Sequence, residues 1–298
     1  MTLRNRAFTK HYLLMLLPGY AWLFLFSIVP MFGLAMAFEN YNPGRGIFRS
    51  EWIGLDNFKY LFSLSDARTI IFNTIFLSTM KILGNLLVPL VFALMLNELR
   101  SPRLKKAVQT VVYLPHFLSW VILAGILLDM FAYRGPVNRF VSAFGGKPVL
   151  FFARADIFPA LVILSDVWKE FGFNAVIYLA ALTGINPSLY EAASIDGAGR
   201  LQQLRAVTLP GLKTTVVLLA VLSLGNIFNA GFDQIFNMYN PTVYSTGDII
   251  DTWVYRAGLL NLQFSLATTA GLLKSAVGFV MITLSYYLAD RFAGYRIF

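Results

Sequence analysis

The stretch YLLMLLPGYAWLFLFSIVPMFGLAMAF, residues 12–38, contains no charged residue and decides the fold class. A helix of about 20 apolar residues is enough to cross the hydrocarbon core of a bilayer, and this run is longer. Basic residues precede the run, as they do in a signal peptide, but it is too long for the apolar part of a cleaved signal. We therefore expect residues 12–38 to form a first membrane span that is retained.

Further apolar runs follow along the chain, and together they predict an all-α membrane protein with six transmembrane helices. Each run must be helical, because lipid offers no partners for free backbone groups. The predicted spans are about 12–38, 69–97, 107–131, 157–183, 214–237 and 263–289. We expect a single transmembrane domain over residues 1–298, with its core at about 69–289.

The overall composition supports a membrane protein and excludes several other classes. Hydrophobic residues make up 57% and charged residues 13% of the chain, whereas a soluble domain has about 25% charged residues. The net charge of +9 comes mainly from basic residues between the apolar spans, so we do not expect nucleic acid as a partner. The chain has no cysteine, which excludes disulfides, thiol nucleophiles and thiolate metal sites.

The distribution of basic residues predicts the orientation. The connections 98–106 and 184–213, together with both chain ends, carry more lysine and arginine than the connections on the opposite side. Cytoplasmic loops carry an excess of these residues. We therefore expect both termini in the cytoplasm.

The longest cytoplasmic connection, residues 184–213, reads GINPSLYEAASIDGAGRLQQLRAVTLPGLK. Pro187 suits a first helical turn, and Ser188 with Glu191 has the spacing of a capping box. Gly197 should end this short helix, and a second helix should run over 198–208 until Pro210 redirects the chain into the fifth span. These features fit an ordinary helical loop as well as a surface that docks on a partner.

A resemblance separates the two interpretations. Glu191-Ala192-Ala193, Gly197 and Leu209-Pro210 keep the spacing of the EAA signature of ABC-importer permeases, with Val207 where isoleucine is usual. The residues from Trp168 to Tyr190 resemble carbohydrate permeases of the maltose-transporter type. The stretches 52–62 and 113–126 are similar to a polysaccharide-transport branch of that family. The resemblance covers nearly the whole chain.

This resemblance implies a place in a larger importer of the bacterial cytoplasmic (inner) membrane. The partners would be a second homologous permease, two ATPase subunits and an extracytoplasmic sugar-binding protein. The loop would form a coupling helix that docks on an ATPase, with Glu191 pairing with a basic residue there and Gly197 permitting the sharp bend. The implied coupling residues are Glu191, Ala192, Ala193, Asp196 and Gly197.

The motifs of nucleotide-binding and hydrolytic enzymes are absent from the sequence. There is no G-x-x-x-x-G-K-[ST] phosphate loop, no H-E-x-x-H metal motif and no G-x-S-x-G nucleophile elbow. Of the two histidines, we expect His11 at the membrane edge and His116 in the interior with a satisfied hydrogen bond. We therefore expect no catalytic residue, cofactor or metal, and ATP hydrolysis on a separate partner.

Several charged residues fall inside the predicted spans, where charges are costly and commonly face a cavity or a polar partner. They are Lys81, Asp129, Asp166, Lys169, Glu170, Asp233 and Lys274. Lys169 and Glu170 follow Asp166 by three and four residues, which favours local ion pairing on one helix. Lining of a substrate pathway is the alternative.

Sugars are bound by aromatic faces together with hydrogen-bonding side chains. The fourth and fifth spans supply both, and in maltose-type permeases the spans on either side of the coupling loop contact the sugar. Our candidate pathway residues are Asp166, Trp168, Glu170, Phe173, Ser223, Asn226, Asn229 and Asp233. Glu170 replaces the glycine, and Ile227 the asparagine, that the resemblance predicts, so we expect a cargo other than maltose. Packing is the alternative role for the aromatic residues.

The sequence thus predicts a permease subunit of an ATP-driven importer for a sugar or oligosaccharide, with uronate-containing oligosaccharides among the candidates. A secondary transporter or channel driven by an ion gradient is the alternative, although no clear internal repeat is present. A membrane-embedded enzyme is disfavoured by the missing motifs.

Overall fold

The computed structural model describes residues 3–293 and the side chains of residues 10–291. The chain packs as two compact units, and each is described by itself. One unit joins the chain up to Ala67 with Trp253–Leu273, and the other joins Arg68–Thr252 with the chain from Lys274 onward. The side chains of Arg4, Arg6 and Arg296, which contributed to the predicted orientation, lie outside the described part.

The first unit begins with the predicted first span. The helical stretch Lys10–Phe38 is long and apolar enough to cross a membrane. It is built from α1 (Leu3–Leu23), a π-helical turn, α2 (Val29–Met31) and a 3₁₀ segment. Strands β1 (Glu39–Asn40) and β2 (Glu51–Trp52) then pair antiparallel, and α3 (Asp56–Ser63) follows.

The first unit is held together by contacts between distant parts of the sequence. Leu61 of α3 packs with Leu266 and Ala270 near the start of α15 (Phe264–Ala293). The Thr269 hydroxyl donates to the carbonyl oxygen of Ala37 at 3.2 Å. These contacts bring the start of the last helix to the end of the first span.

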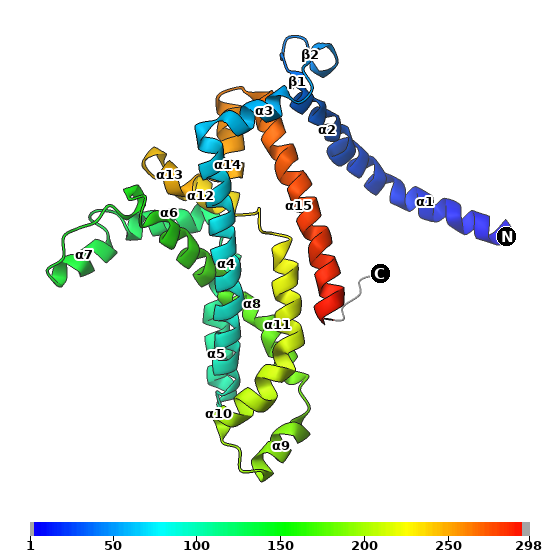
Figure 1. Cartoon of the computed structure of the whole chain (residues 1–298). Coiled ribbons are helices and arrows are strands. Elements are labelled where there is room, and N and C mark those ends of the chain that lie inside the picture. Colours follow the sequence, from blue (N-terminus) through cyan, green and yellow to red (C-terminus); the bar gives the residue numbers. More distant parts are fainter. Residues whose placement is uncertain (1–2, 294–298) are drawn as a thin grey trace. The chain divides into compact units, whose positions relative to one another are not determined.

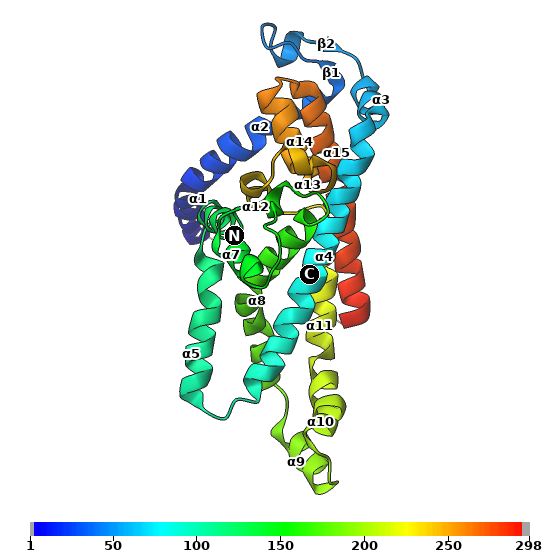
Figure 2. The same ribbon diagram turned by 90° about the vertical axis from the view of Figure 1, so that its left-hand side faces the viewer.

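The second unit holds most of the helices, which Figures 1 and 2 show in two perpendicular views. Besides parts of α14 (Ile250–Tyr255) and α15, its helices are α4 (Ser65–Asn97), α5 (Pro102–Tyr113), α6 (Trp120–Met130), α7 (Pro136–Ala143), α8 (Phe158–Thr183), α9 (Pro187–Ile195), α10 (Arg200–Gln203), α11 (Leu209–Leu224), α12 (Phe232–Met238) and α13 (Tyr244–Gly247). Helix α8 packs against α5 and α11, and α12 packs against α6.

The predicted span at 107–131 is not one straight helix. Helices α5 and α6 are separated by a short break and bent by 101° relative to one another. Pro115 lies in a 3₁₀ turn after α5, and the Ser119 side chain accepts from the backbone N–H of Ile122 at the start of α6. Proline ends one helix and a serine cap starts the next, so the chain turns here.

The fifth predicted span, 214–237, is also interrupted. Helix α11 ends at Leu224, turns follow, and α12 begins only at Phe232. Gly231, the last residue before α12, has φ of 89°, a left-handed conformation that L residues with side chains rarely adopt. In the break, the carbonyl oxygen of Ala230 accepts a hydrogen bond from the Lys81 side chain.

The remaining predictions of spans have different outcomes. Ser65–Asn97, Arg200–Leu224 and Phe264–Arg291 are long and apolar enough to cross a membrane. Helix α8 occupies almost the whole predicted span 157–183, but three charged residues interrupt its apolar character. The count of six spans and the orientation remain predictions.

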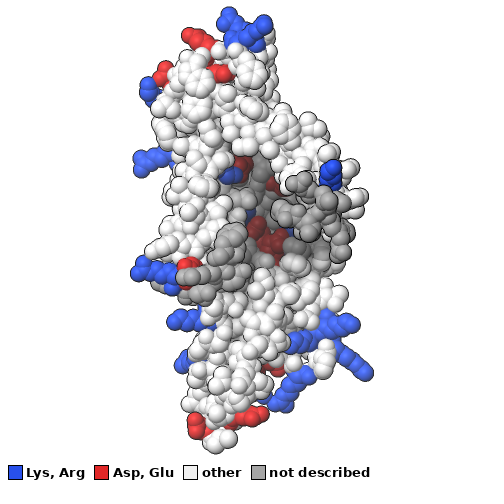
Figure 3. Space-filling model, turned by 90° about the vertical axis from the view of Figure 1, so that its right-hand side faces the viewer, with Lys and Arg blue, Asp and Glu red and all other residues white. Residues whose placement is uncertain are grey.

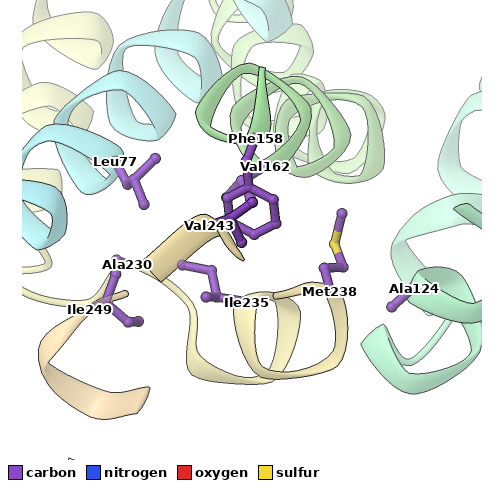
Figure 4. Close-up of a cluster of buried hydrophobic side chains, with 9 residues drawn as sticks. All are labelled: Leu77, Ala124, Phe158, Val162, Ala230, Ile235, Met238, Val243 and Ile249. Carbon is purple, nitrogen blue, oxygen red and sulfur yellow. The ribbon is translucent and has the colours of Figure 1, made fainter. Parts of the chain in front are cut away.

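The core of the second unit lies where these interrupted helices meet. Figure 4 shows Phe158 and Val162 of α8 beside Val243, with Ile235 and Met238 of α12 nearby. Phe158, Val162 and Ile235 are completely buried. This apolar core includes Ile235 and Met238 of α12 together with Ala230 in the break that precedes it.

Candidate functional site

A polar cavity of about 230 Å³ lies in the second unit, beside the interrupted fifth span. Helices α4 and α8, the end of α11 and the following break contribute its walls. The lining residues are Ser78, Lys81, Ile82, Asn85, Asp166, Ser223, Asn226, Asn229, Ala230 and Gly231. Amide, hydroxyl and charged groups therefore face one space in the middle of helices that are otherwise apolar.

Lys81 of α4 is the buried cation of this cavity, with only 6% of its surface exposed. Its Nζ donates to the carbonyl oxygen of Ala230 at 2.6 Å and also to the Gln234 side chain. The Asp166 carboxylate lies 3.4 Å away. A charge can be buried only with such partners, and here a backbone carbonyl freed by the break supplies one of them.

Asp166 of α8 does not form the local pairs that its spacing predicts. Its Oδ2 accepts from the Asn85 side chain at 2.8 Å, and its Oδ1 faces Lys81. Lys169 instead pairs with Glu170 at 2.6 Å. The prediction was wrong for Asp166 because partners on α4 are available once the two helices pack together.

Gln234 of α12 connects the break to α8. Its Nε2 donates to the carbonyl oxygen of Val162 at 2.7 Å and to the Ser165 hydroxyl at 2.9 Å, while its Oε1 accepts from Lys81. A Cβ atom on Gly231 would lie 3.0 Å from the Lys81 Nζ. The φ angle therefore favours glycine at 231, and a side chain there would also crowd the ammonium group of Lys81.

The predicted polar row of Ser223, Asn226 and Asn229 lines this cavity, although not along a regular helix. Successive i→i+3 backbone hydrogen bonds link Ser223 to Asn226 at 3.0 Å and Asn226 to Asn229 at 2.8 Å. Such turns have about three residues per turn, so residues three apart still lie on one side. The three polar residues therefore remain on one side of the chain although α11 has ended.

The other predicted pathway residues lie outside the lining of the cavity. Phe173 stacks on His116 with ring centroids 3.9 Å apart, and the His116 Nδ1 lies 2.6 Å from Glu170. The expectation that His116 has a satisfied hydrogen bond is confirmed. Trp168 on α8 and Asp233 on α12 are both exposed. Of the eight predicted residues, the structure brings Asp166, Ser223, Asn226 and Asn229 together.

Sequence reasoning missed the contribution of α4 to the cavity. Ser78, Lys81 and Asn85 all come from this helix, and only Lys81 carried a signal, as a charge within a span. Ser78 and Lys81 are three residues apart, and Lys81 and Asn85 four apart, which places all three on one helix face. A polar face within an apolar span was the pattern that could have found them.

The predicted coupling loop, residues 184–213, forms a separate structure at one end of the second unit (Figures 1 and 2). Pro187 starts α9 as predicted, but Asn186 caps it rather than Ser188, with its side chain accepting from the Ser188 N–H at 3.0 Å. Gly197, with φ of 79°, ends the helix as expected. The N–H of Ala198 bonds to the carbonyl of Ala193 at 2.9 Å, as in a Schellman motif.

The predicted redirection of the chain at Pro210 was wrong. The helical stretch Arg200–Leu224 runs continuously through α10, a π-helical turn at Leu204–Thr208 and α11. The hydrogen bonds of the π-helical turn depart from the α-helical i→i−4 pattern. Proline, which has no N–H to donate, therefore fits into the helix just after this turn. The loop therefore enters the membrane-spanning helix without a corner.

The surface of the coupling loop is acidic and apolar at its tip and basic behind it. Glu191, Ala192, Asp196 and Gly197 are exposed, and Ala193 is half-buried. The side chain of Ile195 is 87% exposed. Figure 3 shows acidic side chains at this end of the molecule and lysine and arginine above it.

Comparison with known proteins identifies the class to which this fold and site belong. The chain belongs to the family described as the binding-protein-dependent transport system inner membrane component, whose model matches residues 89–294. The predicted permease of an ABC importer, a non-enzymatic subunit with several membrane-spanning helices in a bacterial inner membrane, is thereby confirmed. Family membership decides against the alternatives of a secondary transporter, a channel and an enzyme.

Individual relatives match over almost the full chain. The polygalacturonan/rhamnogalacturonan transport system permease protein YteP of Bacillus subtilis is 40% identical over 95% of this chain and 88% of its own length. Protein LplB of the same species is 37% identical over 94% of this chain and 88% of its own.

A solved structure matches equally well. In the crystal structure of a bacterial ABC transporter involved in import of the acidic polysaccharide alginate, one chain is 39% identical to this one. The match has a TM-score of 0.87 and covers 97% of this chain and 99% of that chain. A second structure contains the alginate transporter in complex with an alginate pentasaccharide-bound periplasmic protein, with a TM-score of 0.86, 38% identity and 97% coverage of each chain.

Proposed function

We propose that this permease moves an acidic oligosaccharide into the cytoplasm, through a path lined by the cavity beside the interrupted fifth span. The observation that carries the proposal is the convergence of the Asn226 and Asn229 amides, the Ser223 hydroxyl and the Lys81 ammonium on one space within apolar helices. Amides and hydroxyls suit the hydroxyl groups of a sugar, and the ammonium suits a carboxylate. The names of the relatives, which concern polygalacturonan and alginate, support the same class of cargo.

We propose further that the chain is one domain, oriented with both termini in the cytoplasm, and that it works beside a second, homologous permease. Two ATPase subunits and an extracytoplasmic sugar-binding protein complete the importer. Helix α9 docks on an ATPase through Glu191, Ala192, Ala193, Asp196 and Gly197. The exposed Ile195 adds an apolar contact, and closure of the ATPases moves the helix and the spans as rigid bodies.

Reconstitution of the complete importer tests this proposal. The chain is purified with its partner permease and ATPases, placed in proteoliposomes, and supplied with its binding protein and labelled trigalacturonate. We expect uptake that requires ATP on the ATPase side and exceeds the uptake of maltotriose, a neutral control of similar size. ATP-dependent uptake of maltotriose alone would contradict an acidic cargo, and uptake without ATP would contradict the coupling.

A further inference from the structure

The hydroxyl of Ser78 is an exception among the buried hydroxyls of the described residues. Serine and threonine side chains in helices commonly donate to the carbonyl oxygen four residues earlier. Thr74, Ser165 and Ser223 all do so, at 2.6–2.7 Å. Ser78 is only 1% exposed, yet its Oγ has no hydrogen-bond partner among the described residues. A buried hydroxyl without a partner is costly and requires an explanation.

The position of Ser78 points to a ligand. Ser78 lines the cavity, and Lys81 follows it by three residues on the same face of α4. The Ser78 hydroxyl and the Lys81 ammonium group thus belong to residues that line the same space from neighbouring turns. Both donate hydrogen bonds, so the ligand that satisfies them together must be an acceptor.

We propose that Ser78 and Lys81 of α4 form a carboxylate subsite in the cavity and select for acidic cargo. This inference rests on the proposed function and deepens it by assigning the residues that recognise charge. A carboxylate has two acceptor oxygens, one for the Ser78 hydroxyl and one for the ammonium, whose three donors rotate on a flexible stem. The hydroxyl of a neutral sugar can accept from Ser78 but brings no charge to Lys81.

Asp166 keeps this subsite from binding its cargo too strongly. Its oxygen lies 3.4 Å from the Lys81 Nζ, longer than the 2.7–2.9 Å of a strong charge-assisted hydrogen bond. Asn85 holds the other oxygen of Asp166 at 2.8 Å. Lys81 can therefore turn toward a cargo carboxylate while Asp166 keeps a partner. The nearby negative charge opposes a permanent complex, as transport requires binding that is weak enough for release.

The test compares two probes that differ in charge, trigalacturonate and its trimethyl ester. Equilibrium binding of each is measured on the purified, complete complex in detergent, for the wild type, Ser78→Ala, Lys81→Met and Lys81→Arg. Lys274→Met is the matched control, because Lys274 is a second partly buried lysine, pairs with Asp251, and lies outside the lining of the cavity. Assembly of each complex is checked by size-exclusion chromatography.

We expect the wild type to bind the acid more tightly than the ester. Ser78→Ala should weaken binding of the acid about tenfold, the factor typical of one lost hydrogen bond to a charged group. Lys81→Met should abolish the preference for the acid, Lys81→Arg should retain part of it, and Lys274→Met should leave it unchanged. Should Lys81→Met fail to assemble, Ser78→Ala alone decides, because it removes a hydroxyl that has no partner among the described side chains.

Three results would overturn the subsite. If Ser78→Ala and Lys81→Met keep the wild-type preference, other residues recognise the charge, while the proposed function stands on the binding of the acid by the wild type. If the wild type binds both probes equally, the subsite is wrong and import of oligosaccharides remains. If the wild type neither binds nor imports either probe, the proposed function fails together with the subsite.

Discussion

The coupling loop and the polar cavity belong to the same unit but are built in opposite ways. Hydrogen bonds in the loop join residues close in sequence, such as Gln203 to Ser194 at 2.9 Å, nine residues away. The cavity is held by Lys81 with Gln234, 153 residues away, and by Asn85 with Asp166, 81 residues away. The loop is largely exposed, whereas the cavity depends on the packing of α4, α8 and α12. The difference suggests that changes in the loop should disturb coupling and leave the fold intact. Changes in the cavity should affect stability and cargo together.

Reversal of the charge in the loop should have the largest effect on function. Glu191→Lys places a positive charge on the exposed tip, where we propose a basic ATPase surface. Breaking a buried charged contact typically costs 2–5 kcal/mol or more. We expect the variant to insert normally but to lose ATPase co-purification and transport. Glu98→Lys serves as the control, because Glu98 is an exposed acid outside α9. Normal transport by Glu191→Lys would show that the contact is elsewhere.

Two left-handed glycines allow a direct comparison of the regions. Alanine at Gly197 meets no atom within 4 Å, so its cost is the backbone strain alone, about 1–2 kcal/mol. Alanine at Gly231 suffers the same strain and also crowds the Lys81 ammonium. Gly231→Ala should therefore lower the unfolding temperature of the complex more than Gly197→Ala does. Gly278→Ala should leave this temperature near the wild-type value. An equal effect at both positions would mean that the Lys81 side chain moves away from the added methyl group without a loss of stability.

Removal of a proposed sugar contact should have a moderate effect. Asn226→Ala deletes an amide that lines the cavity, and one hydrogen bond is typically worth about 0.5–1.5 kcal/mol net. We expect uptake to fall several-fold while the complex still assembles. Asn237→Ala is the control, since the Asn237 side chain bonds to the Asp233 carbonyl and does not line the cavity. Similar uptake by both variants would argue that the row of polar groups serves packing.

Removal of the exposed ion pair between Arg200 and Glu98 should have the smallest effect on stability and transport. Arg200 lies 3.5 Å from Glu98, and both side chains are about two-thirds exposed. Exposed pairs of this kind contribute about 0–1 kcal/mol. Glu98→Gln should leave unfolding temperature and transport close to wild type. A loss comparable to that of Glu191→Lys would extend the coupling surface to α10.

The sequence predicted local features such as helix ends, but it did not predict the contacts between distant segments. The start of α9 at Pro187 and its end at Gly197 follow from the residues themselves, because caps act within one turn. The breaks at Ser119 and Gly231 were missed, since the apolar runs continue across them. The face of Ser78, Lys81 and Asn85 acquires its meaning only when α4 packs on α8, which no spacing within one segment reveals.

Access of water to the cavity tests the central claim most directly. The chain has no cysteine, so Asn226→Cys introduces a single thiol in this subunit. We predict that a charged methanethiosulfonate reagent modifies Cys at 226 in the membrane-embedded complex and that trigalacturonate protects it. Phe279→Cys, at an exposed position on α15 (71%), should remain unmodified if it faces lipid. Failure to modify position 226, or modification that the oligosaccharide does not slow, would contradict a cargo path through this cavity.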